Sequence, residues 1–197
     1  MISGPSGTGK GAICSGLQEY GDTAVSVSMT TRAPRDYEVE GVNYYFVTKE
    51  RFLEVLAGNG FYEHAEIYGE YYGTPKKPVD ELLEKGFDVI LEIDVNGGMQ
   101  VRAQMPEAVL IFIMPPSPEE LRNRIESRGT ETQERIASRL ERSSGEISHM
   151  GEYDYCVIND DLEKAIQDVK IIMQAEKHRV GDDVDRIIER YHAGILV

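Results

Sequence analysis

Residues 1–11 read Met1-Ile-Ser-Gly-Pro-Ser-Gly-Thr-Gly-Lys10-Gly11, in which Gly4, Gly9 and Lys10 have the spacing G-x-x-x-x-G-K. Glycines in such a loop let successive backbone N–H groups face phosphate oxygens, and the lysine neutralises part of the phosphate charge. Ile2 ends an apolar segment suited to a strand, and the residues after Lys10 have a helical pattern. The stretch therefore predicts a nucleotide-binding loop in a strand–loop–helix unit, with an ordinary glycine-rich turn as the alternative.

Two features depart from this pattern. The Ser or Thr that should follow the lysine and reach Mg²⁺ is missing, because Gly11 and Ala12 stand there. Only three residues lead into the loop, whereas a typical strand has about five or six. We therefore expect an incomplete first strand, which would weaken binding at the loop more than binding elsewhere.

The composition indicates one compact unit with small appendages. The chain has 197 residues and a net charge of −14, which argues against binding to nucleic acid. Its longest apolar run, residues 108–114, is too short for a membrane helix, so we expect a cytoplasmic protein without a membrane partner. Cys14 and Cys156 match no metal or disulfide spacing and are expected to be buried. The sequence leaves the oligomeric state open.

The order of apolar segments predicts an α/β fold with a parallel sheet. Runs rich in β-branched residues occur at 24–27, 87–93, 109–114 and 155–158. Segments 118–127, 134–147 and 162–176 have helical periodicity, and Asp160 or Asp161 is suited to cap the last of them. Residues 32–75 break this rhythm: short alternating runs at 43–47 and 61–66 flank a helical segment at 49–57. They predict a small, mostly antiparallel insertion.

Arginines concentrate in one stretch of this acidic chain. Six arginines and four glutamates lie between residues 122 and 142. In a helix Arg124 and Arg128 would share one face, and Arg135, Arg139 and Arg142 would share another. A phosphate clamp and a solvated helix face both fit this charge pattern.

The insertion carries side chains suited to a phosphate and a base. Arg32 and Arg35 flank a proline-stiffened turn and could grip one phosphate with forked donors. Tyr44 and Tyr72 could add hydroxyl donors. A carboxylate and a hydroxyl, such as Glu63 and Thr74, would complement the N–H donors and the O6 acceptor of guanine.

With these residues, the chain resembles the guanylate kinase family over nearly its whole length. The matching stretches include Ser3-Gly-Pro-Ser-Gly-Thr-Gly-Lys10, Ser26-Val-Ser-Met-Thr-Thr-Arg-Ala-Pro-Arg35, Glu38-Val-Glu-Gly41, Tyr71-Tyr-Gly-Thr74, Leu91-Glu-Ile-Asp94 and Val157-Ile-Asn-Asp-Asp161. The resemblance implies a P-loop three-layer α/β/α fold with a parallel central sheet. It also implies a small mixed α/β GMP-binding subdomain at 32–75, an arginine-rich helical lid at 123–142, and a core formed by residues 1–31, 76–122 and 143–197.

The same resemblance implies Mg²⁺-dependent phosphoryl transfer from ATP to GMP, giving ADP and GDP. Its implied catalytic residues are Lys10, Arg124, Arg128 and Arg139. Its implied ATP-binding residues are Gly4, Pro5, Ser6, Gly7, Thr8, Gly9, Lys10, Gly11 and Asn159. Its implied GMP-binding residues are Ser28, Arg32, Arg35, Tyr44, Glu63, Tyr72, Thr74, Glu92 and Asp94. No set of side chains is assigned to a resident metal ion. The alternative is a non-catalytic guanylate-kinase-like binding module with an impaired ATP site, and the tail from Gly181 could add a last packed helix.

Overall fold

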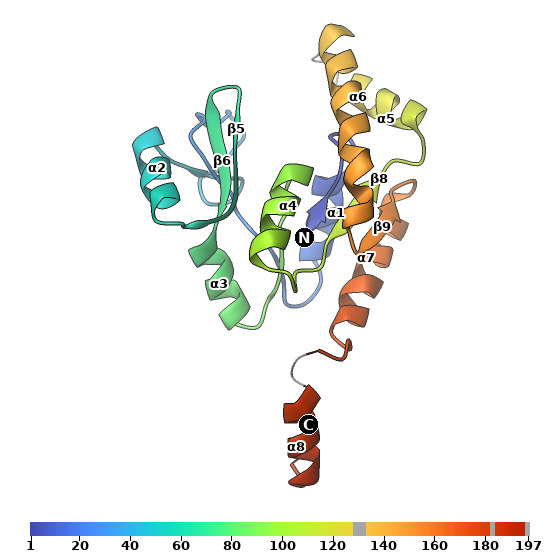
Figure 1. The fold of residues 1–197 in the computed structure, drawn as a ribbon. Coiled ribbons are helices and arrows are strands. Elements are labelled where there is room, and N and C mark those ends of the chain that lie inside the picture. Colours follow the sequence, from blue (N-terminus) through green and yellow to red (C-terminus); the bar gives the residue numbers. More distant parts are fainter. Residues whose placement is uncertain (128–132, 182–183, 196–197) are drawn as a thin grey trace.

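A parallel sheet forms the centre of the molecule in the computed structural model, which describes residues 1–127, 133–181 and 184–195 (Figure 1). Hydrogen bonds from Ile2 N to Leu91 O and from Ile93 N to Ile2 O join its two parts, so the strand order is β2-β7-β1-β8-β9. The strands are β1 (Ile2–Ser3), β2 (Thr23–Val25), β7 (Asp88–Ile90), β8 (Ile111–Met114) and β9 (Tyr155–Ile158). All neighbouring pairs are parallel, as the sequence predicted.

Helices cover both faces of this sheet. One core cluster joins Ile2 and Ile111 to α1 (Lys10–Gln18) and α7 (Leu162–Glu176). A second cluster joins Leu91 to α3 (Lys76–Glu84) and α4 (Val95–Gln104). Successive residues of the sheet point to opposite faces, so Ile90 belongs to the first cluster and Leu91 to the second. The central strands are therefore buried on both sides, as expected for a parallel sheet.

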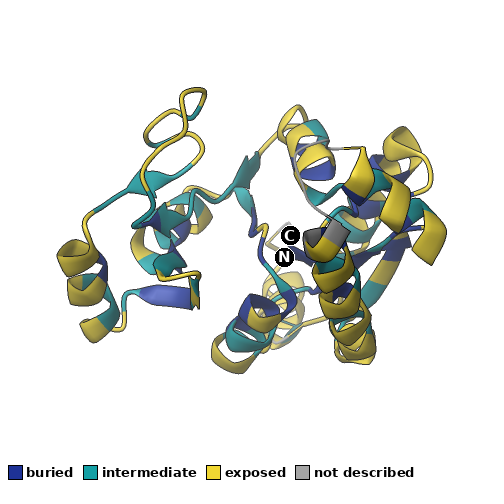
Figure 2. Cartoon of the chain, turned by 90° about the horizontal axis from the view of Figure 1, so that it is seen from above, coloured by how far each residue is buried: buried dark blue, intermediate teal, exposed yellow. Residues whose placement is uncertain are grey.

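A second sheet lies beside this body (Figure 2). Its strand order is β4-β3-β6-β5, with β3 (Met29–Thr30), β4 (Tyr45–Phe46), β5 (Phe61–Ile67) and β6 (Glu70–Pro75). Pairs β3–β6 and β5–β6 are antiparallel, while β3–β4 is parallel. Helix α2 (Lys49–Ala57) packs on this sheet by stacking Phe52 on Phe61, with ring centroids 4.4 Å apart.

Three helical segments complete the described chain before the tail. Helices α5 (Pro118–Glu126) and α6 (Gln133–Ile147) pack through Leu121, Ile125 and Ile136. A short 3₁₀ helix, η1 (Ser148–Glu152), leads from α6 to the edge strand β9. The N-terminus of α5 is stabilised because the Ser117 side chain accepts a hydrogen bond from Glu120 N and Pro118 occupies the first helical position.

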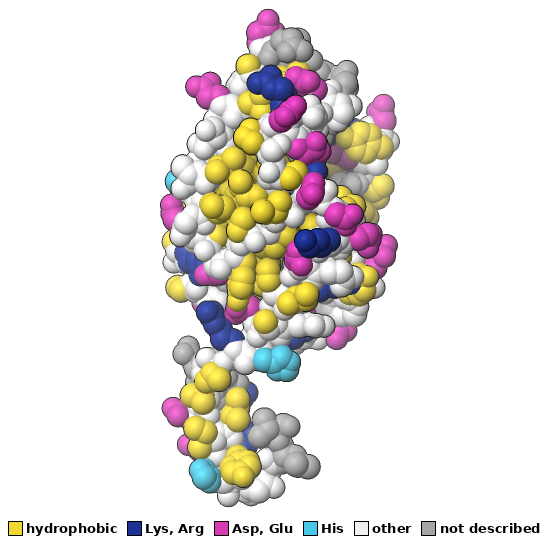
Figure 3. Space-filling view, turned by 90° about the vertical axis from the view of Figure 1, so that its right-hand side faces the viewer, with side chains coloured by type: hydrophobic (Ala, Val, Ile, Leu, Met, Phe, Trp, Pro, Cys, Tyr) yellow, Lys and Arg dark blue, Asp and Glu magenta, His cyan; other side chains and the backbone are white. Residues whose placement is uncertain are grey.

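The tail forms a helix that projects from the body. Helix α8 (Val184–His192) lies apart from the sheet (Figure 1), and hydrophobic side chains are exposed along it (Figure 3). The predicted helix is therefore present, but Ile187, Ile188 and Tyr191 remain exposed rather than packed. The prediction that both cysteines are buried is wrong for Cys156, which lies exposed on edge strand β9, whereas Cys14 is buried in α1. Among the described residues, no helix has the length and apolar character needed to cross a membrane.

Candidate active site

The glycine-rich loop, residues 4–10, connects β1 to α1 at the carboxyl end of the sheet's central strand. Gly4, Gly7 and Gly9 have φ values of 135°, 92° and 90°, which L side chains rarely adopt. A Cβ at Gly9 would also lie 2.3 Å from Asn159 Nδ2. Thr8 is fully buried and donates its hydroxyl to Pro5 O at 3.0 Å. The loop is thus held by its own backbone conformation and by contacts beneath it.

Lys10 folds back over the loop. Its Nζ donates to Gly4 O at 2.6 Å and to Pro5 O at 3.0 Å. Burial lowers the pKa of Lys10, while the nearby Glu92 carboxylate acts in the opposite direction. Burial likewise raises the pKa of Glu92. Lys10 and Glu92 therefore lie near enough to each other beside the loop for each charge to offset part of the effect of burial on the pKa of the other.

Asn159 connects the loop to the arginine-bearing helices. The side-chain Nδ2 of Asn159 donates to Thr8 O at 2.7 Å, and the backbone carbonyl of Asn159 accepts a hydrogen bond from Arg124 Nη1 at 2.9 Å. Arg124 Nε also donates to Glu120 Oε1 at 2.7 Å. The structure thus brings Arg124, Asn159 and the loop into one continuous set of contacts.

Asp94 lies where α4 begins and meets α6. Its Oδ1 accepts a hydrogen bond from Gly97 N at 2.8 Å, which caps α4. Its Oδ2 accepts from Arg142 Nη2 at 3.3 Å. Arg139 lies on the same helix, and its carbonyl accepts a hydrogen bond from Ser143 Oγ. Arg128 lies outside the described residues, so its predicted role is a matter for experiment.

Ser28, Glu63 and Thr74 come together on the second sheet. Thr74 Oγ1 donates to Glu63 Oε1 at 2.6 Å and lies 3.4 Å from Ser28 Oγ. Thr74 is fully buried and Glu63 is 7% exposed. Burial raises the pKa of Glu63, while the hydrogen bond from Thr74 lowers it. Ser28 and Thr74 are 46 positions apart in the sequence, yet the three side chains form one polar cluster.

The arginine turn, residues 32–38, closes around the carboxylate of Glu38. Arg32 Nη1 and Nη2 donate to the two Glu38 oxygens at 3.0 and 2.8 Å, and Arg35 N donates to Oε2 at 2.8 Å. The hydrogen bond to Glu38 raises the pKa of Arg32, and the same bond lowers the pKa of Glu38. The resemblance includes Glu38 in a matching stretch but implies no role for it. The sequence pattern that indicates this pair is a carboxylate six residues after an arginine in the same turn.

Aromatic rings border the arginine turn. The Arg32 guanidinium lies 5.6 Å from the centre of the Tyr44 ring, and Tyr44 meets Tyr72 edge to face at 6.2 Å. Burial raises the pKa of Tyr44, and Tyr72 raises it further. Arg35 instead donates to Tyr37 Oη and is 61% exposed. Arg32, Tyr44 and Tyr72 therefore form a common surface, with Arg35 at its outer edge.

A polar cavity of about 550 Å³ lies between the start of α1 and the second sheet. Its lining includes Gly11, Ser28, Tyr44 and Glu92. Gly11, next to the glycine-rich loop, and Ser28 and Tyr44, which immediately precede β3 and β4 of the second sheet, thus face the same space. Such concave sites with convergent polar groups are typical of small-molecule binding.

A parallel sheet with a glycine-rich loop, facing a polar cavity and neighbouring arginines, places the chain among the nucleotide-binding kinases. A family model described as "Guanylate kinase" matches residues 1–176. The guanylate kinase of Clostridium tetani is 48% identical over 188 residues, covering 95% of this chain and 90% of the relative. That of Clostridioides difficile is 46% identical over 192 residues, covering 97% and 94%. The chain belongs to the guanylate kinase family.

A solved structure agrees with this assignment. The crystal structure of guanylate kinase from Anaplasma phagocytophilum superposes with a TM-score of 0.74 at 38% sequence identity. The match covers 91% of this chain and 85% of that one. Family and fold are therefore supported by sequence and by structure.

Proposed function

We propose that this member of the guanylate kinase family transfers the γ-phosphoryl group of ATP to GMP, giving ADP and GDP. The observation that carries the proposal is the cavity shared by Gly11, next to the loop, and by Ser28 and Tyr44 on the other side. A donor and an acceptor that bind on opposite sides of one cavity can be aligned for direct transfer.

GMP binds at the second sheet in this proposal. The carboxylate of Glu63 accepts from the guanine N–H donors, and the hydroxyls of Thr74 and Ser28 serve the O6 side. Their close grouping and burial support this role, because buried polar groups discriminate strongly against a base that leaves them unpaired. Arg32, Arg35, Tyr44 and Tyr72 hold the GMP phosphate.

ATP binds at the glycine-rich loop and at Gly11 next to it, with Asn159 beside the loop. The backbone N–H groups at the start of α1 and the Lys10 ammonium face the phosphates. To do so, Lys10 exchanges its bonds to Gly4 O and Pro5 O for bonds to phosphate oxygens. Arg124, Arg128 and Arg139 supply positive charge where negative charge develops during transfer. No side chain has to act as a nucleophile.

Mg²⁺ accompanies the ATP phosphates in this proposal. Mg²⁺ keeps several waters and takes one or two carboxylates besides phosphate oxygens. Glu92 and Asp94 fit this role, because both lie in the connection between β7 and α4. Glu92 lines the cavity, and Asp94 is the residue that caps the start of α4. The chain has Gly11 and Ala12 where the loop pattern provides a hydroxyl for Mg²⁺, so in this proposal the carboxylates supply the protein oxygen ligands. When bound, the ion neutralises charge on the transferring phosphoryl group.

Three units perform these tasks: a core of residues 1–31, 76–122 and 143–197, a GMP-binding subdomain at 32–75, and a lid at 123–142. The helices α5 and α6 and the separate second sheet support this division. We place the enzyme in the cytoplasm, where both nucleotides are available. The binding-module alternative is less favoured, because the loop glycines and Lys10 are all retained.

Turnover with four acceptors tests the proposal. GMP, AMP, dTMP and UMP are supplied separately with ATP and Mg²⁺, and ADP formation is measured. We expect turnover with GMP far above that with the other three. Binding of GMP without transfer at millimolar ATP would favour the binding module, and equal turnover with AMP would remove the assigned role of Glu63.

A further inference from the structure

Strand β5 lies at the edge of the second sheet, and helix α4 lies beside it (Figure 1). An edge strand presents backbone N–H and C=O groups that no neighbouring strand satisfies. At His64 one side chain of α4 bonds both groups: His64 N donates to Gln100 Oε1 at 3.1 Å, and Gln100 Nε2 donates to His64 O at 3.0 Å. The Gln100 carboxamide therefore takes the place of a paired residue in a neighbouring strand.

A second glutamine makes a similar contact one turn further along α4. Gln104 Nε2 donates to Tyr62 O at 2.7 Å. Gly97, Gln100 and Gln104 follow one another at intervals of three and four residues, so they share one face of the helix. Glu63 lies between the two bonded residues of β5, and a Cβ at Gly97 would lie 3.0 Å from Glu63 Oε2. The same helix face therefore holds the backbone on both sides of Glu63 and borders its carboxylate.

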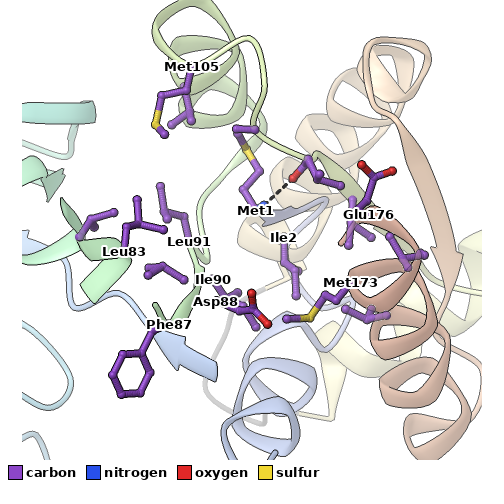
Figure 4. Close-up of a pocket in the computed structure, with 18 of the residues that line it drawn as sticks. Met1, Ile2, Leu83, Phe87, Asp88, Ile90, Leu91, Met105, Met173 and Glu176 are labelled. Carbon is purple, nitrogen blue, oxygen red and sulfur yellow. Dashed lines mark hydrogen bonds between the residues drawn. The ribbon is translucent and has the colours of Figure 1, made fainter. Parts of the chain in front are cut away.

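The adjoining face of α4 is packed less closely. Val101 and Met105 line an apolar cavity of about 340 Å³ that also reaches Leu83 of α3 and Met173 of α7 (Figure 4). A cavity forfeits the close contacts that hold neighbouring elements in place. The hydrogen bonds to β5 therefore contribute more of what sets the distance between α4 and the second sheet.

On the basis of the proposed function, in which Glu63 reads guanine, we propose that Gln100 is a positioning residue for base recognition. It holds β5 at the distance from α4 at which the Glu63 carboxylate meets the base. Glu63 is 7% exposed, so its packed side chain has little freedom to compensate for a displaced backbone. Hydrogen bonds weaken steeply when their distances and angles depart from ideal values. A small shift of β5 therefore costs base recognition.

The expected consequence of such a shift is a loss of selectivity for the 2-amino group of guanine. The Glu63 carboxylate accepts from both N1–H and the 2-amino group in this arrangement, and a paired contact of this kind requires a fixed geometry. Inosine monophosphate (IMP) keeps N1–H and O6 but has no 2-amino group. A displaced carboxylate therefore weakens turnover of GMP more than turnover of IMP.

Gln100→Leu tests this role, because it removes both bonds to His64 and keeps a side chain of similar size and helix propensity. His64 is exposed, so water can replace the lost bonds and the variant should keep nearly the Tm of the parent chain. We expect kcat/KM to fall about tenfold for GMP and about threefold or less for IMP, with KM for ATP unchanged. Gln167→Leu, at an exposed glutamine of α7, is the matched control and should leave these constants unchanged.

A double-mutant cycle measures whether Gln100 acts through Glu63. In a Glu63→Gln background, adding Gln100→Leu should change the ratio of kcat/KM for GMP to that for IMP by less than about twofold. A change as large as that in the parent chain would mean that Gln100 acts elsewhere, and equal losses with GMP and IMP would assign it a general structural role. Either result overturns the proposal. Gln104→Leu removes one bond rather than two and should shift the ratio less; a larger shift than that of Gln100→Leu would overturn the assignment to Gln100.

Glu63→Gln alone separates this proposal from the proposed function. If Glu63→Gln lowers the GMP-to-IMP ratio and Gln100→Leu leaves the ratio unchanged, Glu63 reads the base and Gln100 does not position it. If Glu63→Gln leaves the ratio unchanged, the base-reading role of Glu63 is wrong, and the positioning role of Gln100 is overturned with it.

Discussion

The glycine-rich loop and the arginine turn both suit anions, but they are built from different parts of the chain. The loop uses backbone N–H groups held in place by glycine conformations and by Asn159 beneath them. The arginine turn uses two guanidinium groups arranged around Glu38, and Arg35 is 61% exposed. A backbone site is vulnerable to steric change, whereas a side-chain site is vulnerable to the loss of a charged partner.

The comparison also separates the two substrates. The loop and Asn159 lie on the central sheet, while the arginine turn and the Glu63–Thr74 pair lie on the second sheet. A change in one region should therefore alter the kinetic constants of one nucleotide far more than those of the other. The kinetic constants of each variant are therefore measured with the ATP and GMP concentrations varied independently.

Replacing Lys10 should produce the largest effect. Lys10→Met removes the only side-chain cation of the loop itself, so we expect kcat to fall by roughly 10²- to 10³-fold with little change in GMP affinity. Lys77→Met, at a lysine that is 88% exposed, is the matched control and should keep full activity. Equal losses of kcat and GMP affinity would show that the two regions are not separable.

Gly9→Ala tests whether the loop fails through sterics. Gly9 has φ 90°, and an added Cβ would lie 2.3 Å from Asn159 Nδ2. Gly86 has a similar φ of 86°, but nothing lies within 4 Å of an added Cβ, so Gly86→Ala carries the backbone strain alone. We expect Gly9→Ala to raise KM for ATP by about 10²-fold and Gly86→Ala to lower only stability, by about 1 kcal/mol. Similar ATP constants in both would contradict a steric requirement at Gly9.

The strand that feeds the loop gives a pH-dependent prediction. The Met1 amine has a pKa of about 6 when folded and 8.0 as its ordinary value, so between these values the unfolded chain binds more protons. The free energy of unfolding should therefore fall as pH falls from 8 to 6, by about 2 kcal/mol of the roughly 2.7 kcal/mol that a two-unit difference gives in full at about 1.36 kcal/mol per pKa unit. Urea unfolding at several pH values, with an N-acetylated chain as the control, measures this. The same slope in the acetylated chain would assign it to other groups.

Glu63→Gln tests the base-reading group of the second sheet. The substitution replaces one acceptor oxygen with an NH₂ donor, which would face guanine donors or the Thr74 hydroxyl. We expect kcat/KM for GMP to fall about 30-fold, which corresponds to a loss of about 2 kcal/mol in transition-state stabilisation. KM for ATP should be unchanged. Glu66→Gln, at an exposed position of the same strand, is the control. An unchanged kcat/KM for GMP would mean that Glu63 does not contact the base.

Local patterns predicted the elements better than the contacts between them. Segment 162–176 becomes α7 and Asp161 caps it, because periodicity and capping act within one segment. The expected strand at 87–93 is a strand only at Asp88–Ile90, and beyond it Glu92 makes an isolated bridge to Ile2, a contact between segments 90 positions apart that local periodicity does not encode. The links from Asn159 to Thr8 and to Arg124 span 151 and 35 positions, and no single-segment pattern encodes them.

Of these variants, Glu38→Gln is expected to change the kinetic constants least. Whether it raises or lowers KM for GMP distinguishes two roles of the Glu38 carboxylate. The Glu38 carboxylate fixes Arg32 through two hydrogen bonds and also accepts from Arg35 N. If Glu38 positions the guanidinium for the GMP phosphate, the amide should raise KM for GMP by about tenfold, or about 1.4 kcal/mol, because it cannot accept both Arg32 bonds. Asp36→Asn, in the same turn, removes a charge without touching Arg32 and controls for the general field. A KM for GMP below that of the parent chain would show instead that Glu38 competes with the phosphate for Arg32. In that case the arginine turn would be a site that its own carboxylate keeps closed, unlike the loop, where Lys10 donates to the neutral carbonyls of Gly4 and Pro5.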